Sequence, residues 1–67
     1  MITLTVNGKP RELPGPTGLL DFLQSLEVNI KFVAVGHNGE VLDKENFGAV
    51  VLRQGDVVEI VRPVGGG

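Results

Sequence analysis

The sequence predicts a single small α+β domain, in which one main helix packs on one face of a mixed sheet of four to five strands. Three features indicate this class: an alternating strand that ends in an Asn-Gly turn, one amphipathic helical stretch, and several short β-branched runs after it. The 67 residues leave room for one domain. The 42% hydrophobic content is sufficient for a folded core.

The first two strands are predicted to form a hairpin. Apolar residues alternate with threonines over Met1–Val6, which is typical of a strand with one buried face. Asn7-Gly8 follows, and both residue types tolerate the positive φ of a tight type I′ turn. Lys9–Leu13 returns as the second strand. Pro10 cannot donate a ladder hydrogen bond, so this strand is expected at a sheet edge.

The main helix is predicted over residues 18–27. Thr17 is a suitable N-cap, and Asn29 is a plausible left-handed residue to end the helix. One face of the helix carries four apolar residues at the spacing i, i+3, i+4, i+7, namely Leu19, Phe22, Leu23 and Leu26.

The second half of the chain contains short apolar runs separated by turns. Residues 32–35 are predicted to form a buried strand, 36–39 a turn, and Val41-Leu42 a short return strand. Residues 43–48 are expected to form one helical turn, with Phe47 plugging the core. The last strand covers 57–62 and is ended by a proline.

This order of elements is that of a β-grasp (ubiquitin-like) domain. We expect a right-handed crossover to place the strand after the helix beside the N-terminal hairpin. The β-grasp domain should cover residues 1–63, and residues 64–67 should form a flexible glycine-rich tail.

Composition excludes several classes of function. With no cysteine, the chain has no disulfides, no thiol catalysis and no thiolate-based metal site. The net charge of −2 and the dispersed basic residues argue against a nucleic-acid surface. No apolar run could span a membrane, and no signal peptide is visible, so a cytoplasmic protein that is monomeric when free is expected. The small size favours a binding or carrier module over an enzyme.

Few side chains could act in catalysis or hold a metal. Ser25 is the only serine and lies in the predicted helix, with no base beside it. His37 is interpreted as a solvated turn residue rather than a proton shuttle or ligand. The acidic residues Glu40, Asp43 and Glu45 lack the spacing of a calcium loop and are also interpreted as solvated. We therefore expect no catalytic residue and no metal site.

The C-terminus is the most informative segment. Three glycines, Gly65, Gly66 and Gly67, end the chain, and glycine offers the least steric hindrance to entry into a narrow channel of another protein. The group delivered is the α-carboxylate of Gly67, which must be activated before it can react. No nucleotide-binding motif is present, so the activating site is expected on a partner.

Residues just before the tail are candidates for partner docking. Alternation in the last strand places Val57 and Val61 on the face away from the helix, where exposed valines would form a docking patch. Arg62 lies beside the tail and is a third candidate contact.

The chain resembles the ThiS family of sulfur carriers. The resemblance is carried mainly by G-D-V-V-E-I-V-R-P-V-G-G-G at Gly55–Gly67, with support from N-G-E-V-L at Asn38–Leu42. Two departures are expected to lie in loops. Gly36-His37 resembles a two-residue insertion, and Leu42-Asp43-Lys44 stands where the family often has Pro-Arg.

The resemblance implies a route for sulfur. An adenylating enzyme similar to ubiquitin-activating enzymes (ThiF) would use ATP and Mg to convert the Gly67 carboxylate to an acyl-adenylate. Persulfide sulfur, supplied by a cysteine desulfurase or another donor, would leave a thiocarboxylate, and thiazole synthase (ThiG) would take the sulfur. The chain itself would bind no cofactor. The alternatives are a carrier for molybdopterin synthase (MoaD-like) or for tRNA thiolation, a ubiquitin-like protein modifier, and a passive interaction domain.

Overall fold

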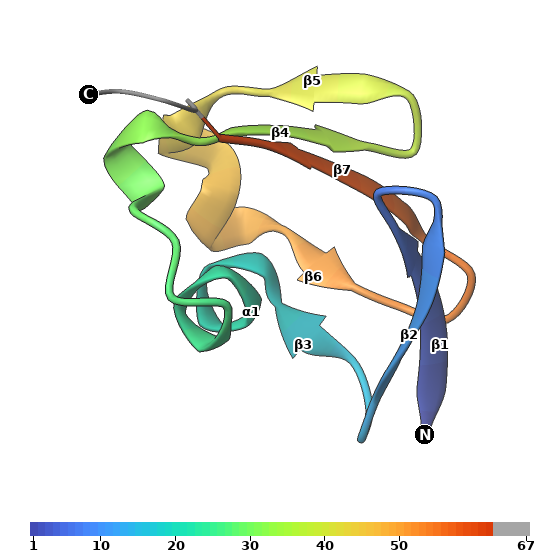
Figure 1. The fold of residues 1–67 in the computed structure, drawn as a ribbon. Coiled ribbons are helices and arrows are strands. Elements are labelled where there is room, and N and C mark those ends of the chain that lie inside the picture. The colour runs from blue at the N-terminus through green and yellow to red at the C-terminus, as the bar shows by residue number, and fades with distance from the viewer. Residues whose placement is uncertain (63–67) are drawn as a thin grey trace.

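The computed structural model describes residues 1–62. They fold into a five-stranded mixed sheet with the helical elements on one face (Figure 1). The sheet contains β1 (Ile2–Val6), β2 (Lys9–Leu13), β4 (Ala34–His37), β5 (Glu40–Leu42) and β7 (Val57–Val61). A second, two-stranded sheet pairs β3 (Thr17–Gly18) with β6 (Val51–Leu52). Helix α1 covers Leu19–Ser25, and 3₁₀ helices cover Ile30–Phe32 and Lys44–Ala49. The α+β class and the predicted one-helix sheet are confirmed.

The N-terminal hairpin forms as predicted. β1 and β2 pair antiparallel, with Val6 opposite Lys9. The turn residues Asn7 and Gly8 both have positive φ, 51° and 81°, as a type I′ turn requires. β2 is the outermost strand, so Pro10 lies at the edge of the sheet, where a missing N–H leaves no partner unpaired.

The strand order differs from the prediction. The order is β2-β1-β7-β4-β5, so β7, and not the strand after the helix, lies beside the hairpin and runs parallel to β1. Placing β4 beside the hairpin was therefore wrong. The sequence of β7, Val-Val-Glu-Ile-Val, is apolar on both faces and lacks proline, which suits a central strand paired on both sides. β4 pairs antiparallel with its other edge.

Both ends of the helix differ from the prediction. Thr17 is not the N-cap. It belongs to β3, its hydroxyl donates to the Gly15 carbonyl at 2.8 Å, and the N-cap position is Gly18. The Leu19 N–H instead donates to the Val50 carbonyl at 2.9 Å, so the neighbouring chain replaces the missing side-chain cap.

At the other end of the helix, Glu27 and not Asn29 takes the left-handed conformation, with φ 59°. Asn29 instead caps the following 3₁₀ helix, where its side chain accepts a hydrogen bond from the Lys31 N–H at 3.0 Å. Asn29 therefore marks the start of the 3₁₀ helix and not, as predicted, the end of the main helix.

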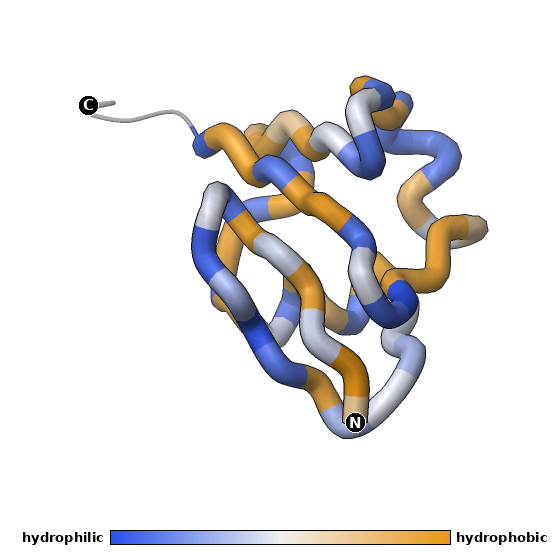
Figure 2. Tube along the Cα trace, turned by 90° about the vertical axis from the view of Figure 1, so that its right-hand side faces the viewer, coloured by the Kyte–Doolittle hydropathy of each residue, from blue (hydrophilic) through white to orange (hydrophobic). Residues whose placement is uncertain are grey.

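The core lies between α1 and the covered face of the sheet. Figure 2 shows strongly hydrophobic residues alternating with threonines along β1, and Ile2 and Leu4 of this strand are buried in the core. Leu19 and Leu23 are fully buried, and Phe47 is buried from the second 3₁₀ helix, as predicted. Leu26 is only partly buried, at the periphery of this core.

Two details of β4 differ from the prediction. Phe32 ends a 3₁₀ helix, and its side chain is 62% exposed instead of buried in a strand. Gly36 and His37 are part of β4, opposite Glu59 and Val58 of β7, so only Asn38-Gly39 forms the turn. The Gly36-His37 departure therefore lies in a strand and not in a loop.

Candidate functional site

The predicted reactive end, Gly65, Gly66 and Gly67, lies outside the described residues. What the structure places is the strand that leads to it. β7 is the middle strand of the five-stranded sheet, hydrogen-bonded to β1 on one side and β4 on the other. Its C-terminal residue, Val61, pairs with Ala34 at the start of β4. The glycine-rich end therefore follows, along the chain, a strand that is paired on both sides.

Asn7 fixes the end of β7 through its side chain. β1 ends at Val6, but the Asn7 Oδ1 accepts a hydrogen bond from the Ile60 N–H at 2.7 Å, and the Asn7 Nδ2 donates to the Ile60 carbonyl at 3.2 Å. The Asn7 side-chain amide thus makes the two hydrogen bonds to β7 that a further residue of β1 would otherwise make, just before the tail. The Asn7-Gly8 pattern predicts only a turn role for Asn7. Its second role depends on the position of β7, which the sequence did not indicate.

The face of the sheet away from α1 carries a shallow apolar groove, here called the open-face groove. It has a volume of about 210 Å³, and its lining includes Ala34, Gly36, Val41, Val57, Glu59 and Val61. Val41 is 84% and Val61 65% exposed. This volume is below the roughly 300–1,000 Å³ of typical small-molecule sites, so the groove suits side chains of a protein better than a substrate.

The three predicted docking residues do not share one surface. Val57 and Val61 line the open-face groove, as alternation predicted. Arg62 is on the other side of the strand, where it lines a groove together with Leu26 and Val28, next to the end of α1. The part of the chain leading into the tail therefore presents valines on one face and a guanidinium on the other.

A polar network joins the β4–β5 turn to the start of β7. His37 Nε2 lies 2.9 Å from Asp56 Oδ2, and Asn38 Nδ2 donates to Asp56 Oδ1 at 3.2 Å. The Arg53 N–H donates to Asp56 at 3.0 Å, and the Val57 N–H donates to Asn38 Oδ1 at 2.8 Å. His37 is thus a half-buried strand residue with a carboxylate partner, which corrects its interpretation as a solvated turn residue.

The network lowers the pKa of Asp56. Partial burial acts to raise this pKa, but hydrogen bonds from His37, the Arg53 N–H and Asn38, together with the charge of His37, outweigh burial and bring it below the ordinary value of 3.8. Because folding favours the ionised carboxylate, Asp56 stabilises the fold fully above its unfolded-state pKa of about 3.9. This stabilisation is lost as the pH falls through the folded-state pKa.

We therefore expect Asp56→Asn to lower the free energy of unfolding at pH 7 by about 1–3 kcal/mol, as for hydrogen bonds to a charged group. The difference from wild type should narrow below about pH 4, where Asp56 of the wild type becomes protonated. Urea unfolding between pH 7 and pH 2.5 measures this. Glu12→Gln, at an exposed position on β2, is the control and should follow the wild type throughout. A pH-independent difference for Asp56→Asn would contradict the assignment.

The remaining candidate groups are not gathered into a site. Among residues 1–62 there is no group of three or more histidine, cysteine, aspartate or glutamate side chains that could hold a metal ion. The Ser25 hydroxyl donates to the Phe22 carbonyl of its own helix at 2.6 Å. No helix within the described range is long and apolar enough to cross a membrane.

Taken together, the five-stranded sheet with one main helix and the central strand that precedes a glycine-rich end define the class: a ubiquitin-like β-grasp domain. The model of the ThiS family matches residues 4–67. The chain therefore belongs to the ThiS family of small sulfur carrier proteins of thiamine biosynthesis.

Relatives and solved structures agree with this family. A sulfur carrier protein ThiS of Bacillus subtilis is 42% identical over 65 residues, which cover 96% of this chain and 98% of that protein. The crystal structure of a thiamine biosynthesis protein (ThiS) from Geobacter metallireducens is similar with a TM-score of 0.84 at 40% identity, covering 98% of this chain and all of that one.

A second kind of relative is much longer. A thiazole synthase of Magnetococcus marinus is 37% identical over 62 residues, which cover 92% of this chain but 19% of that protein. A thiazole synthase of Paramagnetospirillum magneticum matches in the same way, at 34% identity over 20% of its length. In both proteins, a segment similar to this chain is part of a polypeptide named for the enzyme.

Proposed function

We propose that the chain carries sulfur as a thiocarboxylate on Gly67. In this proposal an adenylating enzyme similar to ThiF binds ATP and Mg and joins AMP to the Gly67 carboxylate, releasing pyrophosphate. The observation that carries the proposal is the match of the ThiS family through residue 67, which includes the glycine-rich end. This chain itself supplies the carboxylate and binds no cofactor.

The sulfur step follows from the chemistry of an acyl-adenylate. A persulfide, supplied through a cysteine desulfurase or another donor, attacks the activated carbonyl carbon and AMP leaves. A second thiol then attacks the donor's sulfur atom in the resulting acyl disulfide and breaks the S–S bond. The donor and this thiol leave joined as a disulfide, and the thiocarboxylate is freed. Because this chain has no cysteine, no internal thiol competes for the activated carbonyl.

We further propose that thiazole synthase (ThiG) receives the sulfur and that the carrier carboxylate is restored by the transfer. The two longer relatives support this acceptor, because a segment similar to this chain occurs there within a thiazole synthase. This observation favours thiazole synthase as the acceptor of the sulfur over molybdopterin synthase or tRNA thiolation. It also favours sulfur transfer over conjugation of the chain to proteins.

In our proposal the domain of residues 1–63 positions the tail of residues 64–67, and Gly65 and Gly66 are needed for its passage into partner channels. Four residues can span at most roughly 13–14 Å, so a partner must approach the end of β7 closely. We assign the open-face groove, with Val57 and Val61, as the apolar docking surface for thiazole synthase, because it leads along β7 to the tail.

Sulfur transfer tests this function. Carrier loaded with ³⁴S at Gly67 is mixed with thiazole synthase and its other substrates. We expect the label to appear in the thiazole while the carrier returns to its carboxylate mass. Val57→Asp should slow the transfer at least about tenfold, because it replaces an apolar contact with a third carboxylate beside Glu40 and Glu59. Val51→Asp is the matched control, since Val51 is similarly exposed (40%, against 45% for Val57) but lies on the separate β3–β6 sheet.

Label that stays on the carrier in the presence of active thiazole synthase would exclude this acceptor. Accumulation of high-mass conjugates would indicate a protein modifier. Equal slowing by Val51→Asp and Val57→Asp would remove the open-face groove from the docking surface while leaving the sulfur chemistry intact.

A further inference from the structure

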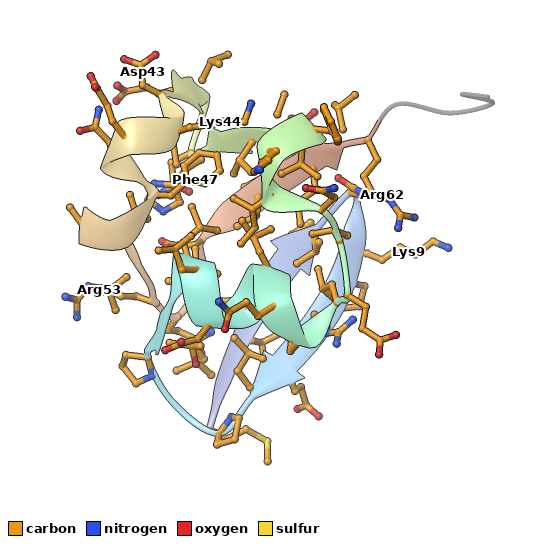
Figure 3. All side chains as sticks on the ribbon, turned by 90° about the vertical axis from the view of Figure 1, so that its left-hand side faces the viewer. Lys9, Asp43, Lys44, Phe47, Arg53 and Arg62 are labelled. Atoms are coloured by element: carbon orange, nitrogen blue, oxygen red, sulfur yellow. The ribbon has the colours of Figure 1, made fainter. Side chains whose placement is uncertain are left out.

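Positive charge gathers on the helix side of the sheet, at the point where the tail begins. Arg11 and Arg62 line one groove of about 240 Å³, here called the helix-side groove, whose apolar walls are Val6, Leu26, Val28 and Ile60. Lys9 lies two residues before Arg11 on the same face of β2. Figure 3 shows Lys9 and Arg62 extending on the same side of the molecule, whereas Arg53 extends on the opposite side.

These cations are not neutralised within the described part of the chain. The lining of the helix-side groove includes no carboxylate, although the whole protein has a net charge of −2. Glu27 lines a neighbouring cavity with Arg62, but the one ion pair found within residues 1–62 is between His37 and Asp56. Within residues 1–62, neither guanidinium of the helix-side groove forms an ion pair, and Glu27 is a carboxylate that lines a cavity with Arg62.

Arg11 is also held in position. Its guanidinium carbon lies 5.5 Å from the centre of the Phe22 ring, a cation–π contact with a side chain that is 1% exposed. A guanidinium whose rotamers are already restricted loses less entropy when it binds a carboxylate. The groove therefore combines a fixed planar donor, a second guanidinium beside the tail, and aliphatic walls.

We propose that the helix-side groove binds an acidic segment of the adenylating enzyme, with a carboxylate between Arg11 and Arg62 and an adjacent aliphatic side chain against Val28 and Leu26. The inference rests on the proposed function. A small inorganic anion would leave the apolar walls exposed, so an aliphatic residue beside an acid fits the groove better.

The position of the groove favours the adenylating enzyme as its occupant, because the open-face groove on the other side of β7 is already assigned to thiazole synthase. An adenylating enzyme must be met in solution, and charge complementarity chiefly raises the rate of such encounters.

Binding to the adenylating enzyme of the same organism, measured by stopped flow between 20 and 500 mM NaCl, tests the proposal. We expect Arg11→Glu and Arg62→Glu each to weaken binding at least about tenfold at low salt, mainly through slower association, and the loss to shrink as salt rises. Arg53→Glu carries the same charge change on the far side of the molecule and should remain within about twofold of wild type.

Two further measurements keep the result interpretable. Arg11→Gln and Arg62→Gln remove the charge but keep a polar, hydrogen-bonding side chain, so weaker binding by these variants with unchanged thermal unfolding excludes a folding defect. Thiocarboxylate formation by the wild type is measured alongside. If the wild type binds and is thiolated, but the Arg11→Glu and Arg62→Glu variants bind as tightly as the wild type, this inference is overturned and the proposed function stands. Self-association of the wild type that Arg62→Glu abolishes would assign the groove to a second copy and also overturn it.

Discussion

Addition of one alanine after Gly67 is expected to reduce thiocarboxylate formation at least about a hundredfold, without changing the melting temperature. The extra residue moves the terminal carboxylate by roughly 3.5 Å and puts an amide where the reacting carboxylate was. Misplacement of a reacting group by even 1 Å can cost about a hundredfold. Intact mass after reaction with the adenylating enzyme and a persulfide measures the product, and thermal unfolding measures the fold.

The matched control is one alanine placed before Met1, at the start of β1 and away from the end of β7 (Figure 1). This variant should be thiolated at the wild-type rate. If the C-terminally extended protein were thiolated as fast as the wild type, the reaction would not require the carboxylate of Gly67, and the assignment of Gly67 would be wrong.

Leu23→Ala is expected to lower the free energy of unfolding by about 2–5 kcal/mol, the usual cost of such a cavity. Leu23 is fully buried between α1 and the sheet, so little relaxation into solvent is available. In a domain of this size the melting temperature should fall by at least about 8 °C. Denaturant and thermal unfolding measure both quantities.

Two substitutions calibrate that result. Gln24→Ala, at the next and exposed position of α1, should change the free energy of unfolding by less than about 0.5 kcal/mol. Leu23→Met keeps the side-chain volume and should cost less than about 1.5 kcal/mol. A loss for Leu23→Ala no larger than that for Gln24→Ala would be incompatible with the helix packing described above.

Local pattern predicted most of the elements, because each depends on nearby residues. The threonine alternation of β1, the Asn7-Gly8 turn and the burial of Phe47 all formed as expected. The failures occurred where a partner distant in sequence decided the outcome. Thr17 is held in β3 by pairing with Leu52, and that pairing removed it from the N-cap position.

The strand order was predicted wrongly for a related reason. Nothing local to β7 indicates whether it pairs with β1 or lies at an edge, since parallel pairing joins segments about fifty residues apart. The same pairing gives Asn7 its role at Ile60, and the pairing of β7 with β4 places Asp56 against His37. These interactions could be recognised only after β7 had been placed in the centre of the sheet.

The candidate site was predicted in part. Alternation along β7 was sufficient to place Val57 and Val61 on the open face. The same alternation also puts Arg62 on the opposite face. Its nearness to the tail predicts a docking role, but it does not place Arg62 on the same surface as the valines. Exposed Phe32 was missed, since an apolar run cannot distinguish a strand from a short 3₁₀ helix.

The central claim, that Gly67 carries sulfur, is tested most directly by the intact mass of the protein after incubation with ATP, Mg, the adenylating enzyme and a persulfide donor. The account predicts a gain equal to the exchange of one oxygen for one sulfur, located at Gly67 by fragmentation and dependent on ATP. An unchanged mass in the presence of an enzyme and donor proven active on another ThiS protein would contradict it.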